Sequence, residues 1–339
     1  MHNIDYPGPV TSLSQEIDEM KYRQKGESFN DKIKRIARAL ADDTDHQYSL
    51  EDILGTMRFL PAGRVQSSVG SNRITTAYNC FVSGTIEDSM HSIMEKASEA
   101  AETMRRGGGI GYDFSKIRPR GDRIKSLDSQ SSGPISFMGI FDAVCQTIAS
   151  SGHRRGAQMG VLRIDHPDIE EFVAAKRNSD KLTGFNISVG ITDKFMEALL
   201  SDGNDDFQLH YEGIEYRTIS ANKLWDSIME STWDWAEPGV LFIDRIKEMN
   251  NLFYCEEIAA TNPCGEQPLP PYGACLLGSF NLTKYIVDNT FNFSQFKKDI
   301  PIVVQAMDNV IDRTIYPLKQ QSDEAKDKRR MGLGVTGLA

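Results

Sequence analysis

The sequence predicts an α/β fold. Segments with strand character alternate with segments of helical periodicity over most of the chain. The 339 residues are 40% hydrophobic and 25% charged, which is typical of a globular protein with a core, and they contain no internal repeat or low-complexity run. Alternation of strands and helices over such a length predicts parallel strands connected by helices.

Residues 1–60 are predicted to form a mainly helical region. Apolar residues recur at helical spacing in one segment: Ile33, Ile36, Ala37 and Leu40. Asn30 or Asp31 is the predicted N-cap of that helix, and a second helix is predicted over 49–58. The Pro-Ala-Gly sequence at 61–63 breaks the pattern and predicts the first domain boundary.

Beyond residue 61, helices and strands alternate. A Gly-rich turn at 107–114 is predicted to enter a strand. An apolar stripe predicts a helix at 87–105, and further helices are predicted at 134–150, 192–201, 220–235 and 296–315. Strands are predicted at 157–164, 184–190 and 239–243. The small, apolar segment 331–339 is not typical of a natural C-terminus, and we expect more structure to follow it.

Composition and terminal pattern exclude several classes of protein. The net charge of −10 argues against direct nucleic-acid binding. No apolar stretch approaches the roughly 18 residues of a membrane helix, and the N-terminus has no signal-peptide pattern. We therefore expect no membrane partner and a cytoplasmic location.

Familiar ligand motifs are also missing. The glycines at 107–111 have the wrong spacing for a dinucleotide fingerprint and follow a helix. No Walker A sequence occurs, and no Cys/His spacing fits a zinc site, so no metal site is predicted. His166, beside a proline, is interpreted as a turn or helix-cap residue.

The odd number of cysteines does not fit a secreted disulfide framework, and a single cysteine is more often a buried apolar residue than a reactive one. The five are Cys80, Cys145, Cys255, Cys264 and Cys275. Cys264 is distinguished by its neighbours. Asn262 lies two residues before it and Glu266 two residues after it. Between them, Pro263 restricts the backbone and Gly265 makes it more flexible. Such a loop can aim an amide, a thiol and a carboxylate at one small volume, although a structural Pro-rich loop is the alternative.

This segment resembles the finger loop of ribonucleotide reductase catalytic subunits, whose motif is N-x-C-x-E. Other segments resemble the family in the same order along the chain: Leu60–Arg64, Asn79–Val82 with Glu87–Ser89, Gly107–Arg118, Ser132–Pro134, Arg154–Ala157 and Arg329–Gly334. The resemblance implies a ten-stranded α/β barrel with a Cys-bearing finger loop, of which residues 61–339 form the first half. Residues 1–60 do not resemble the ATP-binding cone of many relatives. Because the resemblance covers only the first half of the barrel, a C-terminal half on another chain is expected, and the chain alone is expected to be inactive.

The resemblance also implies catalytic roles. Cys264 becomes a thiyl radical and abstracts the ribose 3′ hydrogen, Glu266 takes the 3′-hydroxyl proton, and Asn262 holds the sugar hydroxyls. Cys80 and Cys275 deliver two electrons and form a disulfide, for which the barrel must bring them together. Cys145 and Cys255 match no family role and are interpreted as structural.

Nucleotide contacts follow from the same resemblance. Ala62, Asn79 and Gly109 are the expected substrate contacts. Asp88 and Arg118 match positions that bind a deoxynucleotide effector at a dimer interface, because a carboxylate suits a ribose hydroxyl and an arginine suits phosphates. The glycine-containing loop at 150–160 is expected to relay effector identity. Its Arg154 and Arg155 are assigned to the effector, with a solvated loop as the alternative.

The radical source stays open between two classes. The wording of the finger loop and the 11-residue spacing from Cys264 to Cys275 favour adenosylcobalamin. A separate metal-containing radical subunit is the alternative, and a thioredoxin- or glutaredoxin-type reductant is implied in both. The substrate is a ribonucleotide, whose diphosphate or triphosphate form the sequence does not decide. A noncatalytic nucleotide-binding or regulatory fragment of the same fold is the rival function.

Overall fold

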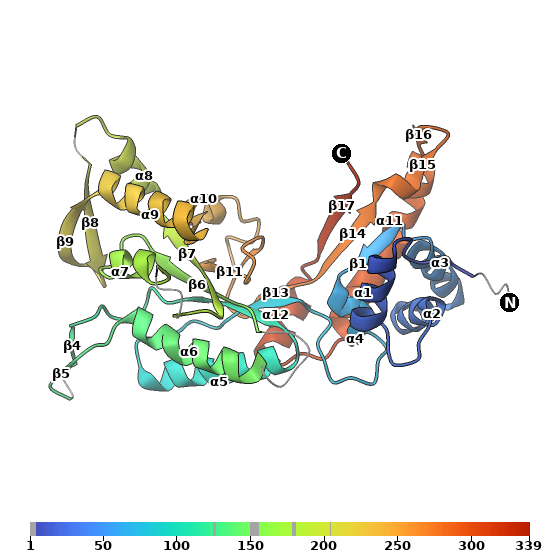
Figure 1. Cartoon of the computed structure of the whole chain (residues 1–339), viewed down its shortest axis with the longest axis horizontal. Coiled ribbons are helices and arrows are strands. Elements are labelled where there is room, and N and C mark those ends of the chain that lie inside the picture. The colour runs from blue at the N-terminus through green and yellow to red at the C-terminus, as the bar shows by residue number, and fades with distance from the viewer. Residues whose placement is uncertain (1–4, 125–126, 150–155, 178–180, 204) are drawn as a thin grey trace. The chain divides into compact units, whose positions relative to one another are not determined.

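The computed structural model describes residues 5–124, 127–149, 156–177, 181–203 and 205–339. The chain forms two compact units, one of residues 1–79 with 274–339 and the other of residues 80–273 (Figure 1). Across the described ranges, no helix has the length and apolar character needed to cross a membrane. The predicted α/β class is confirmed in outline, and each unit is described separately below. The boundary predicted at residue 61 stays a prediction.

The first unit combines helices with a small sheet. Its helices are α1 (Ser12–Tyr22), α2 (Phe29–Leu40), α3 (Thr44–Gly55), α4 (Gly63–Ser68), α11 (Phe293–Arg313) and α12 (Lys319–Lys328). The sheet has the order β1-β14-β17, from β1 (Phe59–Pro61), β14 (Leu277–Asn281) and β17 (Gly332–Thr336). Helix α11 packs against both α2 and α3. The helical character predicted for residues 1–60 is thus confirmed.

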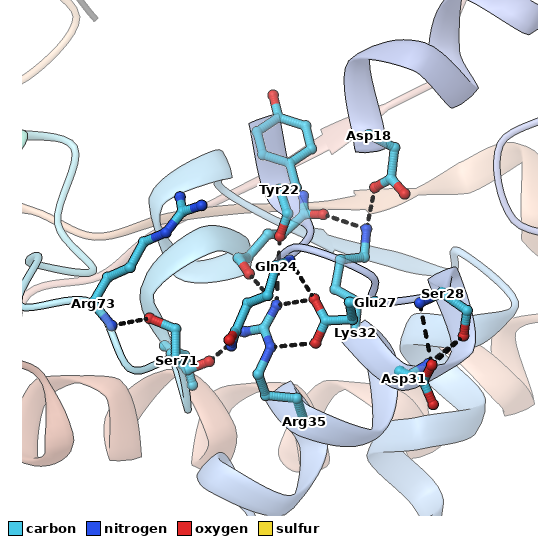
Figure 2. Close-up of polar contacts among 12 residues, drawn as sticks. Asp18, Tyr22, Gln24, Glu27, Ser28, Asp31, Lys32, Arg35, Ser71 and Arg73 are labelled. Atoms are coloured by element: carbon cyan, nitrogen blue, oxygen red, sulfur yellow. Dashed lines mark hydrogen bonds and ion pairs between the residues drawn. The ribbon is translucent and has the colours of Figure 1, made fainter. Parts of the chain in front are cut away.

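The predicted start of α2 is wrong. Ser28, rather than Asn30 or Asp31, is the N-cap, and Asp31 lies in the first turn. The Ser28 hydroxyl accepts a hydrogen bond from the Asp31 backbone N–H at 3.1 Å, and the Asp31 carboxylate accepts one from the Ser28 N–H at 3.1 Å (Figure 2). This reciprocal capping box satisfies two backbone donors together. The helix predicted at 49–58 instead begins at Thr44, behind the N-cap Asp43, and ends at Gly55.

A buried network of charges joins α1, α2 and α4 (Figure 2). Lys32 is only 2% exposed; its ammonium forms an ion pair with Asp18 and donates to Gln66 Oε1 at 3.1 Å. Burial lowers the pKa of Lys32, and the Asp18 carboxylate opposes that shift. Arg35 donates to Glu27 at 2.7 and 3.0 Å and to the Gln66 carbonyl at 3.1 Å. Lys32 and Arg35 of α2 therefore hold α4 against α2 through their hydrogen bonds to Gln66.

The second unit is built on parallel strands in the order β10-β7-β6-β3-β2. The strands are β2 (Cys80–Val82), β3 (Gly109–Asp113), β6 (Gln158–Arg163), β7 (Phe185–Ile191) and β10 (Gly239–Phe242). The helices are α5 (Met90–Arg105), α6 (Pro134–Ala149), α7 (Ile169–Ala174), α8 (Asp193–Leu200), α9 (Ala221–Trp235) and α10 (Ile243–Glu248). The helices and strands predicted with bounds beyond residue 61 are present, which confirms those predictions.

The antiparallel hairpins of this unit are not foreseen by the sequence. Two of them join β8 (Asp206–Tyr211) to β9 (Ile214–Ser220) and β4 (Arg123–Ile124) to β5 (Ser129–Gln130), and a third is described with the candidate site. Most of β9 is exposed on both of its faces, so it lacks the alternation of apolar and polar residues that identifies a half-buried strand.

The two faces of the parallel sheet differ because alternate side chains of a strand point to opposite sides. On β3, Ile110 and Tyr112 belong to the hydrophobic core, where the Tyr112 ring lies 4.8 Å from that of Phe141 on α6. Gly109, Gly111 and Asp113 therefore occupy the opposite face. Their partners in register share that face: Cys80, Val82, Met159, Val161, Asn186, Ser188, Arg163 and Gly190. We call this surface the inner face.

Replacing Lys32 with methionine is expected to lower the free energy of unfolding by about 3 kcal/mol, because it leaves the buried Asp18 without its ammonium partner. Lys298, exposed on α11, offers the matched control, and Lys298→Met is expected to stay within about 0.5 kcal/mol of the parent. Urea unfolding measures both. Equal stability of the two variants would contradict a structural role for the buried pair.

Candidate active site

The segment that carries the candidate catalytic residues is the turn of a β-hairpin. Strands β11 (Ala260–Thr261) and β12 (Pro268–Leu269) pair antiparallel, and residues 262–267 connect them. The Asn262 N–H donates to the Gln267 carbonyl at 3.2 Å, and the Gly265 N–H donates to the Asn262 carbonyl at 3.0 Å. Gly265 has a φ of 83°, a left-handed conformation that glycine adopts without a steric penalty. The local sequence thus forms a tight, closed turn.

Within this turn, the amide of Asn262 orients the carboxylate of Glu266. Asn262 is fully buried; its Nδ2 donates to Glu266 Oε2 at 2.6 Å, and its Oδ1 accepts from the Gln267 N–H at 2.9 Å. Cys264 and Glu266 are both exposed. The structure therefore brings a buried amide into contact with an accessible carboxylate on the turn that also presents the Cys264 thiol.

The hairpin lies directly on the backbone of the inner face. A Cβ atom added to Gly111 would lie 1.8 Å from the Thr261 carbonyl oxygen, and one added to Gly109 would lie 2.8 Å from Pro263 Cγ. Only glycine allows such an approach. Cys80 pairs in register with Gly109 and shares its face of the sheet. Cys80 and Gly109 are thus neighbours of the turn that carries Cys264.

Asn186 of β7 is a contact that the sequence did not indicate. Its Nδ2 donates to the Pro263 carbonyl at 2.7 Å, so it holds the peptide that leads into Cys264. The close approach of Gly111 to Thr261 was not predicted from the sequence either. Asn186 lies 77 residues from Pro263 and carries no local motif that would have identified it.

Three predicted site residues belong to the first unit. Ala62 is the N-cap residue of α4, and its N–H donates to the Leu277 carbonyl at 2.9 Å. Asn79 is half-buried, and its Oδ1 has no hydrogen-bond partner among the described residues. Cys275 is fully buried in the short strand β13 (Ala274–Cys275). The roles assigned to these residues stay predictions.

The predicted effector residues Asp88 and Arg118 contact each other. Arg118 Nε donates to Asp88 Oδ2 at 2.6 Å, and the Arg118 backbone N–H donates to Oδ1 at 3.2 Å. This hydrogen bond raises the pKa of the Arg118 guanidinium. Asp88 lines a cavity of about 420 Å³ together with charged and aromatic side chains of the β3–α6 and β8–β9 segments. Arg154 and Arg155 lie outside the described residues.

His166 lines the same cavity and is a turn residue, as predicted. Its Nδ1 accepts from the Asp168 N–H at 3.1 Å, and its Nε2 lies 2.9 Å from the Ile117 carbonyl. Burial lowers the pKa of this imidazole. The ring thereby joins the turn before α7 to the segment that follows β3.

The two cysteines without a family role differ in environment. Cys145 is buried in the core, and burial raises the pKa of its thiol to about 11. Cys255 is exposed, and its thiol lies 3.5 Å from the Leu252 carbonyl. Neither residue belongs to the turn or to the inner face.

Comparison with known proteins places these features in a family context. Residues 78–339 match the family model described as the ribonucleotide reductase barrel domain. The chain is 38% identical over 291 residues to a vitamin B12-dependent ribonucleoside-diphosphate reductase of Thermoplasma acidophilum, covering 85% of this chain and 38% of the relative. It is 39% identical over 288 residues to the protein of the same name from Mycobacterium tuberculosis, covering 85% and 41%. The chain therefore spans about two fifths of the length of these relatives.

Gly111→Ala is expected to displace the hairpin, because the new methyl group would overlap the Thr261 carbonyl. We expect a loss of at least about 2 kcal/mol in the free energy of unfolding and faster hydrogen exchange at residues 260–269. Gly139 of α6 has open space around it, so Gly139→Ala is the matched control and is expected to stabilise the protein by up to about 1 kcal/mol. Unchanged exchange of the hairpin in Gly111→Ala would rule out the close contact.

Proposed function

Since the chain belongs to the ribonucleotide reductase family and contains its barrel domain over residues 78–339, we propose that it provides the thiyl-radical part of a site that reduces ribonucleotides to 2′-deoxyribonucleotides. The observation that carries this proposal is the turn in which buried Asn262 binds Glu266 beside the exposed Cys264. The names of the relatives support ribonucleoside diphosphates as substrates.

Cys264 is the proposed hydrogen-atom carrier. Loss of a hydrogen atom from its thiol leaves a thiyl radical, which takes the 3′ hydrogen of the ribose and restores the S–H bond. Glu266 accepts the proton of the 3′ hydroxyl, and this proton transfer makes departure of the neighbouring 2′ hydroxyl as water easier. Accessibility of both side chains on one turn supports these roles.

Asn262 is proposed to hold the sugar hydroxyls and to position the carboxylate of Glu266, the catalytic base. Because its amide is buried and donates to Glu266, a change in the position of Asn262 would also move the carboxylate. Gly109, whose lack of a side chain lets Pro263 pack against β3, is a proposed substrate contact, as are Ala62 and Asn79. The unpartnered Oδ1 of Asn79 among the described residues supports a polar ligand there.

Cys80 and Cys275 are the proposed electron donors. Their two thiols supply two electrons and two protons: one proton leaves with the 2′ hydroxyl as water, the other provides the hydrogen that replaces this hydroxyl on C2′, and a disulfide results. The Val82 N–H donates to the Gly273 carbonyl at 2.9 Å, which ties the chain just before Cys275 to the strand of Cys80 and supports the pairing. A thioredoxin- or glutaredoxin-type dithiol would then reduce the disulfide.

Adenosylcobalamin is the proposed radical source, because the relatives are vitamin B12-dependent reductases. When bound, it supplies the organic radical that oxidises Cys264. A separate metal-containing subunit is the alternative. Within the described ranges, no group of three or more His, Cys, Asp and Glu side chains is placed to hold a metal ion.

Regulation and assembly are proposed from the family resemblance. Asp88 and Arg118 would bind a deoxynucleotide effector at a dimer interface, with Arg154 and Arg155 in the adjoining loop. Asp88 and Arg118 form an ion pair with each other, so the carboxylate would have to bind the effector ribose, and the guanidinium its phosphates, in addition to this contact. The parts of the relatives that this chain does not cover, about three fifths of their length, are expected to be required for turnover.

Cys264→Ser is expected to abolish turnover, because a serine hydroxyl does not form the radical under these conditions. The assay combines the chain, the polypeptide corresponding to the rest of the relatives, adenosylcobalamin, a dithiol and a ribonucleoside diphosphate, and measures deoxynucleotide formation. Cys255→Ser, at an exposed thiol outside the turn, is the control and is expected to retain activity. Nucleotide binding without turnover by the unmodified protein would instead favour a noncatalytic regulatory role.

Glu266→Gln is expected to lower kcat by roughly 10²–10³-fold. The amide preserves the shape of the side chain, but it cannot accept the 3′-hydroxyl proton. Glu230, exposed on α9 away from the turn, provides the control variant Glu230→Gln, which is expected to be unaffected. Steady-state kinetics measure both. A kcat for Glu266→Gln equal to that of the control would remove Glu266 from the proton-transfer step.

A further inference from the structure

A second cavity lies on the inner face, at the carboxyl ends of the parallel strands. Its volume is about 310 Å³. The ends of four strands line it, at Ser83, Asp113, Arg163 and Gly190, and the hairpin stem lines it at Ala260 and Leu269. The catalytic turn lies toward the amino ends of the same strands, next to Cys80 and Gly109. In open α/β sheets, the carboxyl ends of parallel strands are the usual place for a ligand.

Ser83 provides a buried hydroxyl without a partner among the described residues. The residue is 6% exposed, and its Oγ makes no hydrogen bond to any of them. Its backbone N–H is satisfied by the Gly111 carbonyl at 2.8 Å, so only the side chain is left without a contact. Because burying an unpaired hydroxyl costs free energy, a buried orphan of this kind on a cavity wall indicates a polar ligand.

Three cations line the cavity from separate elements: Lys116, Arg163 and Lys247. Each has one acidic partner and retains hydrogen-bond donors. Lys116 and Lys247 donate to Glu87 at 3.0 Å and to Glu257 at 2.7 Å, but an ammonium carries three donors. Arg163 engages Asp165 through Nε at 3.0 Å and Nη2 at 2.5 Å, and its Nη1 has no bond to the described residues.

The acidic side chains that line the cavity are Asp113 and Glu257, and both already have partners. Asp113 accepts a hydrogen bond from the Ser115 N–H at 3.0 Å, and desolvation raises the pKa of its carboxyl. Glu257 is 77% exposed and is already paired with Lys247. The cavity therefore offers an incoming ligand hydrogen-bond donors that the paired carboxylates leave unused, beside an apolar wall that includes Val82, Val161, Ile243 and Leu269.

We propose that this cavity binds the phosphate group of a small organic phosphate. A phosphate supplies several acceptor oxygens for the ammonium, guanidinium and hydroxyl donors. The cavity volume and the apolar wall leave room for the carbon skeleton of a phosphate ester. Because Ala260 and Leu269 pair with each other in the hairpin stem, the bound molecule would also contact the hairpin that carries Cys264. Such binding goes beyond the proposed reaction and does not depend on it.

Binding is tested on the full chain by calorimetric titration and thermal unfolding with two probes, inorganic phosphate and ribose 5-phosphate. We expect ribose 5-phosphate to bind and to raise the Tm. Ser83→Ala and Lys247→Met, both within this cavity, are each expected to weaken binding by about 10- to 100-fold, the usual effect of losing one hydrogen bond to a charged group. Lys319→Met removes another carboxylate-paired lysine at an exposed position, and it is expected to leave binding unchanged.

A packing defect at Ser83 would give a different result from a phosphate site. In that case Ser83→Ala would raise the Tm of the ligand-free protein and leave phosphate affinity unaltered, which would overturn the proposal. Absence of binding by both probes, or equal affinity in Lys247→Met and Lys319→Met, would also overturn it. Binding of inorganic phosphate alone, with the same variant pattern, supports the site and identifies free phosphate as its ligand. Asp88→Asn, in the neighbouring cavity, is expected to retain ribose 5-phosphate affinity, which distinguishes this site from the proposed effector site.

Discussion

The contact between Gly111 and the Thr261 carbonyl controls the geometry of the second unit. A Cβ at position 111 would lie 1.8 Å from that oxygen, so no side chain separates the hairpin from the sheet. The hairpin is thus positioned by backbone against backbone, and the bond from Asn186 to the Pro263 carbonyl holds the turn from the side. Rigid placement matters here because the rate of a reaction between bound groups falls steeply when they are misplaced by about 1 Å.

The hairpin also divides the inner face into two regions. Toward the amino ends of the strands lie Cys80, Gly109 and the turn, and toward the carboxyl ends lies the cavity at Ser83 and Arg163. Both regions touch the same short hairpin, whose stem is only two residue pairs long. A molecule bound at one end therefore contacts the element that forms the other end, which gives a physical route for coupling between the two.

Periodicity and local motifs explain what the sequence could predict. The core strands and helices were located because their apolar residues follow regular spacing, and the turn was located because Asn262, Cys264 and Glu266 form a local motif within five residues. The start of α2 was misplaced because Asp31 has the residue type of a cap but serves as the third residue of a capping box begun by Ser28. Asn186 and Ser83 were missed because their roles depend on residues distant in sequence, and no local pattern records those contacts.

Two buried polar groups show how the presence or absence of hydrogen-bond partners distinguishes a structural role from a ligand-binding role. Lys32 is nearly inaccessible, but Asp18 and Gln66 bind its ammonium, so its burial is explained within the first unit. The Ser83 hydroxyl is similarly buried and has no partner among the described residues. A buried charge with partners fixes a fold, whereas a buried donor without one retains a free-energy cost that a ligand can remove. The cations around Ser83 make an oxyanion the ligand that would remove it.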